Sequence, residues 1–127
     1  MMISHFLHAA LLVSDLHRSS QFYGTVLGLA MVDRPLDFPG IWYQIGAVQL
    51  HLMVDENLIN HPINDRAATP IKWGRNRHLA FAIEDLERCK TQLETHGCPV
   101  QLSASGRPAL FTQDPDGNVI ELTQIHP

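Results

Sequence analysis

The chain has 127 residues and a mass of 14.3 kDa, a size typical of one domain that buries its own core. Hydrophobic residues make up 45% of it and charged residues 17%, which excludes an intrinsically disordered chain. Lys and Arg total 9 against 13 Asp and Glu, and the resulting net charge of -4 gives no basic surplus that would predict nucleic-acid binding.

The cysteines and the apolar segments indicate the compartment. Cys89 and Cys98 form no CxxC motif, so we expect two reduced thiols in a cytoplasmic protein. Residues 6–13 are mostly apolar, but His8 interrupts them and they lack the basic segment of a signal peptide. No apolar run reaches the about 20 residues that a membrane-spanning helix needs, so we expect no membrane association.

The first half of the chain predicts a strand, a helix and three further strands. The helix follows Asp15, a residue suited to cap it, and ends before Gly28. The strands are expected at residues 8–13, 29–33, 41–45 and 48–54. Residues 55–77 are rich in Pro and Asn and predict a long connecting loop.

The second half repeats this order. Residues 78–88 match residues 8–18 in their His, Ala, Asp, Leu and Arg positions. A helix is expected between Asp85 and Gly97, and strands at residues 78–83, 99–102, 109–113 and 118–124. We therefore predict an α+β fold of two βαβββ modules within one domain, 1–127, with module 1 at about 1–54, a linker at 55–77 and module 2 at 78–127.

The repeat also places polar residues at matching positions. His8 and His78 begin the two modules, and the alignment of the closing strands makes Gln49 equivalent to Glu121. Equivalent residues of two pseudo-symmetric halves face each other, so two imidazoles, an amide and a carboxylate would converge. This set suits a divalent first-row metal with open coordination positions. The alternative is a pair of hydrogen-bonded histidines in the core.

Strand alternation identifies further groups near these residues. Gln49 and His51 share one face of their strand, and Glu121 and Thr123 share the matching face of the other. His51 is a candidate base, or alternatively a supporting or solvent-facing residue.

The combined motifs resemble the vicinal oxygen chelate superfamily, which includes glyoxalase I, methylmalonyl-CoA epimerase, extradiol dioxygenases, and fosfomycin and bleomycin resistance proteins. The resemblance covers nearly the whole chain and is carried by His8, residues 13–16, 18–23, 27–29, 48–52, 77–81 and 114–122. It implies paired modules that form an incomplete barrel around one metal ion (Zn, Ni, Co, Mn or Fe), held by His8, Gln49, His78 and Glu121. It also implies a homodimer. In some members of the superfamily, the metal site takes ligands from both chains.

The resemblance implies an enzyme that acts on a small molecule. We expect a metal-dependent lyase, isomerase or epimerase that chelates its substrate through two oxygens and stabilises an enolate-type intermediate, with Glu121 or His51 as the base. One alternative is an Fe(II) ring-cleaving dioxygenase that uses His8, His78 and Glu121 as a two-His, one-carboxylate set. Another is a drug-binding protein of the bleomycin resistance type, without catalysis.

Two sets of residues remain weaker candidates. Four cations could bind an anionic group near the site or simply be solvated: Lys72, Arg75, Arg77 and Arg107. Four aromatic residues could line an apolar pocket: Trp42, Tyr43, Trp73 and Phe111. Trp42 and Tyr43 are neighbours on a strand, so only one of them can face the site.

Overall fold

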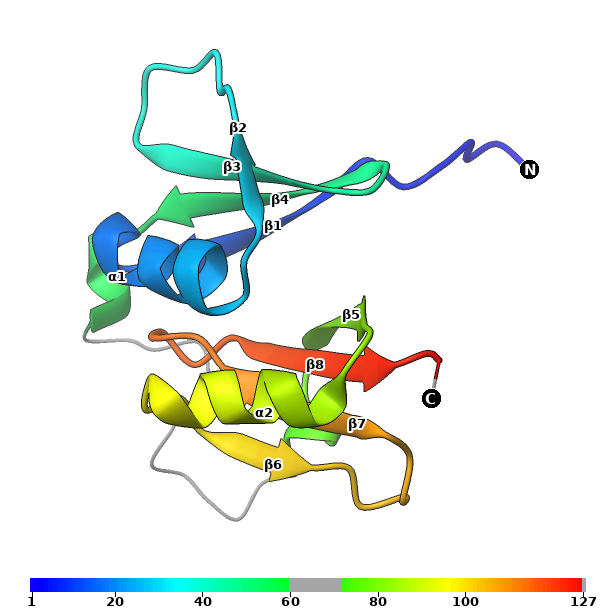
Figure 1. Ribbon diagram of the computed structural model, residues 1–127. Coiled ribbons are helices and arrows are strands. Elements are labelled where there is room, and N and C mark those ends of the chain that lie inside the picture. The colour runs from blue at the N-terminus through cyan, green and yellow to red at the C-terminus, as the bar shows by residue number, and fades with distance from the viewer. Residues whose placement is uncertain (60–71, 127) are drawn as a thin grey trace. The chain divides into compact units, whose positions relative to one another are not determined.

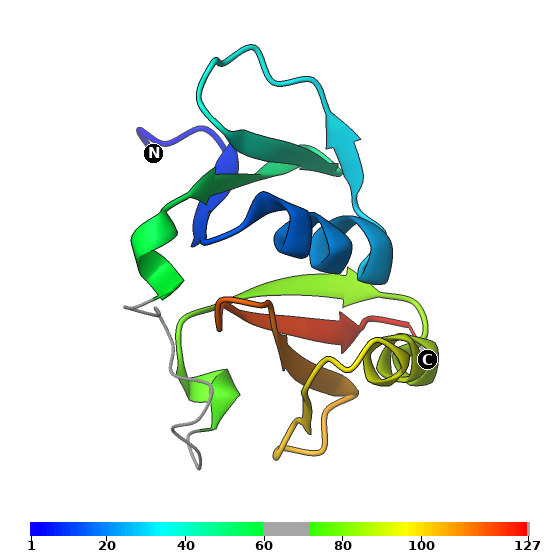
Figure 2. The same cartoon turned by 90° about the vertical axis from the view of Figure 1, so that its left-hand side faces the viewer.

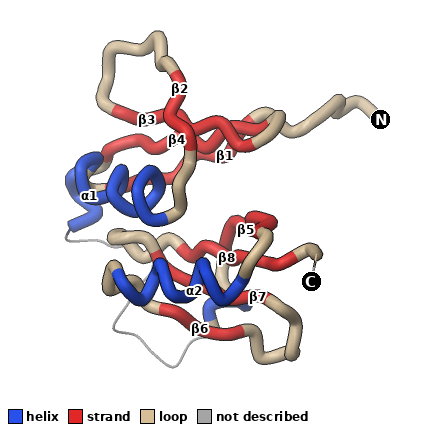
Figure 3. The backbone as a smooth tube through the Cα atoms, viewed as in Figure 1, coloured by secondary structure: helices blue, strands red, loops and turns tan. Residues whose placement is uncertain are grey.

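Each half of the chain folds into a four-stranded sheet with a helix against one face (Figure 1 and Figure 3). The computed structural model describes residues 1–59 and 72–126, so residues 60–71 of the predicted linker lie outside the described residues. The chain divides into two compact units, Met1–His61 and Pro62–Pro127.

Unit 1 contains the first βαβββ module. Its strands are β1 (His8–Val13), β2 (Ala30–Val32), β3 (Gly40–Ile45) and β4 (Val48–Val54). The helices between β1 and β2 are α1 (Leu16–Ser20) and the π-helix η1 (Gln21–Val26), and the 3-10 helix η2 (Glu56–Ile59) follows β4. The sheet order is β1-β4-β3-β2, with β1 parallel to β4 and the other pairs antiparallel.

Unit 2 repeats the same topology. After the 3-10 helix η3 (Trp73–Arg75) come β5 (His78–Ile83), α2 (Leu86–Thr95), β6 (Val100–Leu102), β7 (Ala109–Gln113) and β8 (Val119–Gln124). The sheet order is β5-β8-β7-β6, with β5 parallel to β8. Figure 2 shows α2 almost end-on beside these strands. Two βαβββ modules are thus present as predicted, and the strand limits differ from the predicted ones by no more than one residue at an end.

The same local signals begin and end the helices in both units. The Asp15 carboxylate accepts a hydrogen bond from the Arg18 amide at the start of α1, and Asp85 does the same for Arg88 at the start of α2. Gly28 and Gly97 follow the helices with φ values of 75° and 71°, a conformation that glycine adopts without strain. The predicted first helix differs in one respect: it changes to π-type bonding after Ser20, and Leu27 N donates to Phe22 O. Among the described residues, none of the helices is long and apolar enough to cross a membrane.

Alternation along the strands separates an apolar face from a polar face in each sheet. In unit 1 the side chains of Tyr43, Leu50 and Leu52 are buried, and Tyr43 lies beside Gly24 of the π-helix. In unit 2 Leu110, Ile120 and Leu122 are buried on the face that packs against α2. His8 and His78 lie on the opposite, polar faces, as the alternation predicted.

The strand register corrects the predicted alignment of the repeat. His8 pairs with Gln49 in unit 1, but His78 pairs with Val119 in unit 2. Ala10 pairs with His51 and Ala80 pairs with Glu121, so His51 is the register counterpart of Glu121. A shift of two residues leaves every side chain on the same face, which is why the alternation was predicted correctly although the equivalence of Gln49 and Glu121 was wrong.

Candidate metal centre

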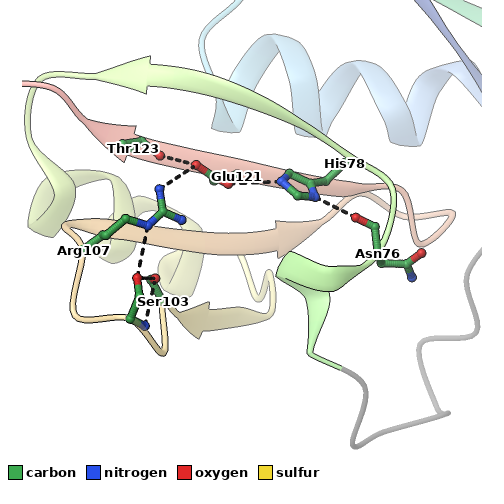
Figure 4. Close-up of polar contacts among 7 residues, drawn as sticks. Asn76, His78, Ser103, Arg107, Glu121 and Thr123 are labelled. Atoms are coloured by element: carbon green, nitrogen blue, oxygen red, sulfur yellow. Dashed lines mark hydrogen bonds and ion pairs between the residues drawn. The ribbon is translucent and has the colours of Figure 1, made fainter.

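In unit 2 the predicted ligands His78 and Glu121 are in direct contact. His78 Nε2 lies 3.1 Å from Glu121 Oε1 (Figure 4). The other ring nitrogen, Nδ1, lies 2.7 Å from the backbone carbonyl of Asn76. A carbonyl only accepts hydrogen bonds, so Nδ1 carries the hydrogen and the ring is held with Nε2 directed at the carboxylate. This backbone anchor could not be read from the sequence, because any residue at position 76 offers a carbonyl.

Glu121 has two further polar neighbours. The Thr123 hydroxyl donates to Glu121 Oε2, and Arg107 Nη1 lies 3.8 Å from the same oxygen (Figure 4). Only 8% of Glu121 is exposed, so these groups offset the cost of burying its charge. The strand pattern had placed Thr123 on this face, whereas the position of Arg107 depends on the loop before β7.

Unit 1 brings together three aromatic rings on its polar face. The rings of His8 and His51 are stacked with centroids 4.0 Å apart, and Trp42 stacks on the other side of His51 at 4.2 Å. Trp42 therefore faces the site, and Tyr43 is turned toward the helix. In unit 2 Phe111 has the register position of Trp42, and its ring meets His78 edge-on at 5.4 Å.

A chain of amides fixes the orientation of His51. Gln44 Nε2 donates to the Gly46 carbonyl at 2.8 Å, which leaves Gln44 Oε1 to accept from Gln49 Nε2 at 2.9 Å. Gln49 Oε1 then lies 2.8 Å from His51 Nε2 and accepts its hydrogen. The lone pair of the neutral His51 ring is consequently on Nδ1, and the oxygen of Gln49, the predicted ligand, is already hydrogen-bonded.

The surroundings of His51 favour its neutral form. Burial lowers the pKa of His51 below its ordinary value, and the nearby charges of His8 and Arg34 lower it further. A neutral imidazole is the form that binds a metal ion or accepts a proton.

The predicted ligands thus occur as two pairs. His8 and Gln49 are register partners in unit 1, and His78 and Glu121 touch in unit 2. Among the described residues, 1–59 and 72–126, no group of three or more His, Cys, Asp and Glu side chains is assembled as a metal site. The chemistry of the unit 2 pair fits a metal nevertheless, because an imidazole nitrogen and a carboxylate oxygen are both ligands of divalent first-row ions and lie only 3.1 Å apart here.

For the remaining candidate residues, the structure gives no hydrogen bond or ion pair with the four predicted ligands among the described residues. Lys72, Arg75 and Arg77 are exposed. Trp73 is half-buried in η3, where its amide donates to Gln101 Oε1 at 2.9 Å.

Comparison with known proteins identifies the family. Residues 5–122 match the model of the glyoxalase/bleomycin resistance protein/dioxygenase superfamily. The chain belongs to this superfamily. The four predicted ligands all lie within the matched residues of this superfamily member.

Individual relatives are distant. The superfamily member is 28% identical over 122 residues to glyoxylase I 4 of Arabidopsis thaliana, covering 91% of this chain and 67% of the relative. Its fold is similar to that of a lactoylglutathione lyase from Agrobacterium tumefaciens (23% identity, 98% of this chain and 96% of that chain, TM-score 0.67). A genomically encoded fosfomycin resistance protein from Listeria monocytogenes has a TM-score of 0.74 at 18% identity, with 98% and 94% of the two chains covered.

Proposed function

We propose that this protein is a metal-dependent enzyme that abstracts a proton next to a carbonyl group of a small molecule, as a lyase, isomerase or epimerase. The observation that carries the proposal is the contact between His78 Nε2 and Glu121 Oε1 at 3.1 Å, with the imidazole anchored through Nδ1. Superfamily membership supports enzymatic activity of this general type.

The proposed ligands are His8, His78 and Glu121, together with a donor from β4. The sequence predicted Gln49 for that donor, and two observations favour His51. His51 has the register position that Glu121 has in unit 2, and Gln49 Oε1 already accepts one hydrogen bond from the His51 ring. Gln49 would then orient His51, a role that neighbours of metal ligands commonly have.

The side chains present can perform the chemistry of proton transfer. A bound divalent ion would supply positive charge where negative charge develops on a substrate oxygen. The Glu121 carboxylate would accept the proton at one oxygen, while the Thr123 hydroxyl holds the other oxygen. The His51 imidazole is the second predicted base. It could take this role only if Gln49, and not His51, is the metal ligand from β4.

A homodimer, a small-molecule substrate and a cytoplasmic location belong to the same proposal. They rest on superfamily membership and on the absence of a CxxC motif in the sequence. The metal is Zn, Ni, Co, Mn or Fe, since imidazole and carboxylate ligands accept all of these ions.

Elemental analysis of protein purified without a tag or added metal tests the proposal. We expect about one equivalent of a divalent metal, lost in His78→Ala and retained in His96→Ala, a matched change at an exposed histidine after α2. Failure of the wild-type protein to contain or take up any of the five ions would contradict the proposal and favour a binding protein. Iron as the only ion that supports activity would favour the dioxygenase alternative.

A further inference from the structure

The two units each place an arginine in the loop before the third strand of the module, and the two arginines differ in what they contact. Arg34 of unit 1 is used by its own loop. Its Nη1 donates to the carbonyls of Phe38 and Leu36, and its guanidinium carbon lies 4.4 Å from the centre of the Phe38 ring. Arg34 therefore serves to hold the loop before β3.

Arg107 of unit 2 is held in a different way. Its Nε donates to Ser105 Oγ at 3.1 Å, and Ser105 Oγ lies 2.9 Å from Ser103 Oγ (Figure 4). Backbone bonds close the same loop, from Ser103 N to Ala109 O at 3.0 Å and from Ala109 N to Arg107 O at 2.7 Å. The guanidinium is thus fixed through its Nε, while 52% of the side chain stays exposed.

The contact between Arg107 and Glu121 is too long to explain this arrangement. Nη1 lies 3.8 Å from Glu121 Oε2, beyond the about 3.2 Å limit of a good N–H···O hydrogen bond. The two Glu121 oxygens already interact with His78 and Thr123. A guanidinium that is anchored through Nε on a half-exposed side chain can bind a carboxylate or phosphonate group through two hydrogen bonds.

We infer that Arg107 is a specificity-determining residue that binds an oxyanion group of the substrate, a carboxylate or a phosphonate, next to the atoms that react at Glu121. The inference rests on the proposed function. A metal ion bound to Glu121 would neutralise part of the carboxylate charge, so the positive charge of Arg107 would be available to the substrate. The substrate class is therefore a small molecule with two chelating oxygens and an adjacent anionic group.

Calorimetry with matched chelators tests this inference on the metal-loaded protein. Acetohydroxamate chelates a metal through two oxygens, and N-hydroxysuccinamate adds a carboxylate to the same chelating group. We expect the carboxylate form to bind about tenfold more tightly to the wild-type protein, as one charged hydrogen-bond pair at a half-exposed site provides. A phosphonate counterpart shows which of the two anions the site prefers.

Three variants assign the effect. Arg107→Ala should bring the affinity ratio close to one without weakening acetohydroxamate, and Arg107→Lys should retain part of the ratio because it keeps the charge and loses the paired donors. Arg88→Ala removes the same charge from an exposed position in α2 and should leave the ratio unchanged. A ratio near one in the wild-type protein, or an unchanged ratio in Arg107→Ala, would overturn the inference.

Failure of the metal proposal has a different signature. In that case acetohydroxamate does not bind at all, and Arg107 is judged from its Nε–H signal in an NMR titration with succinate and methylphosphonate. A saturable shift of that signal, with binding lost in Arg107→Ala, supports oxyanion recognition. The absence of a saturable shift overturns it.

Discussion

The polar faces of the two sheets differ far more than their folds do. Both units have the same strand order and the same aspartate caps, but unit 1 carries the stacked rings of His8, His51 and Trp42, whereas unit 2 carries the ion pair of Arg107 and Glu121. The two units thus place polar or aromatic side chains at the same register positions, although the residue types at these positions differ. His51 and Glu121 share one register position, and Trp42 and Phe111 share another.

This comparison indicates a division of roles between the units. In the proposed function, the carboxylate and the half-exposed guanidinium of unit 2 would supply the charged contacts to the metal and to an anionic substrate. Unit 1 would contribute its imidazoles, and the orientation of the His51 ring depends on the amide chain through Gln49. Substitutions at matched positions of the two units should therefore differ in their effects on metal affinity and on stability.

The largest expected difference is in metal affinity. Glu121→Ala removes the proposed charged ligand and should weaken metal binding by more than about 100-fold, while Gln49→Ala removes a contact that orients His51 and should weaken it by about tenfold. Competition with a fluorescent chelator measures both affinities. If the two variants lose metal affinity equally, Gln49 would instead be a direct metal ligand, as Glu121 is proposed to be.

The turn before β8 of unit 2 should be more sensitive to substitution than the loop before β3 of unit 1. Asp114 is fully buried in unit 2, and its carboxylate accepts bonds from the amides of Asp116 and Asn118 and from Asn118 Nδ2. Asp114→Ala should lower the free energy of unfolding by about 2–3 kcal/mol, because buried donors lose a charged acceptor. Urea titration gives the value, with Asp37→Ala, at an exposed position before β3, as the control. A loss as small as that of the control would contradict this account.

A smaller effect is expected at Gly74, where the chain passes close to Phe111. A Cβ at Gly74 would lie 2.7 Å from Phe111 Cζ, whereas one at Gly24 of unit 1 would meet Tyr43 at an ordinary 3.7 Å. Gly74→Ala should cost about 1–2 kcal/mol in the free energy of unfolding and displace the ring that contacts His78. Thermal unfolding beside Gly24→Ala checks this, and similar Tm values for the two variants would refute it.

The smallest effect is on pH dependence in unit 1. The pKa of His51 is lowered in the folded protein, chiefly by burial, so below its ordinary value of 6.5 the unfolded chain binds more protons than the folded one. This group should therefore stabilise the protein above pH 6.5 and lose that contribution as the pH falls through the window below 6.5. Urea titrations at several pH values should show a weaker loss in His51→Gln than in the wild-type protein or in His96→Gln. An identical pH slope in all three proteins would exclude His51 as the cause.

Local sequence patterns were enough to predict the two modules and the faces of their strands. Local signals account for this success: Asp15 and Asp85 cap the helices, Gly28 and Gly97 end them, and the period of two along each strand assigns His8 and His78 to the polar faces. The two halves also supported each other, because a signal that is weak in one copy recurs in the other.

The contacts between the polar residues, in contrast, follow from strand pairing and loop geometry. The register that makes His51 the counterpart of Glu121 depends on how strands far apart in the sequence pair, and a shift of two residues leaves no trace in the alternating pattern. The anchor of His78 is a backbone carbonyl, and the position of Arg107 follows from hydrogen bonds within its loop. These contacts depend on backbone geometry and strand pairing, and neither is encoded in the residue types of a motif.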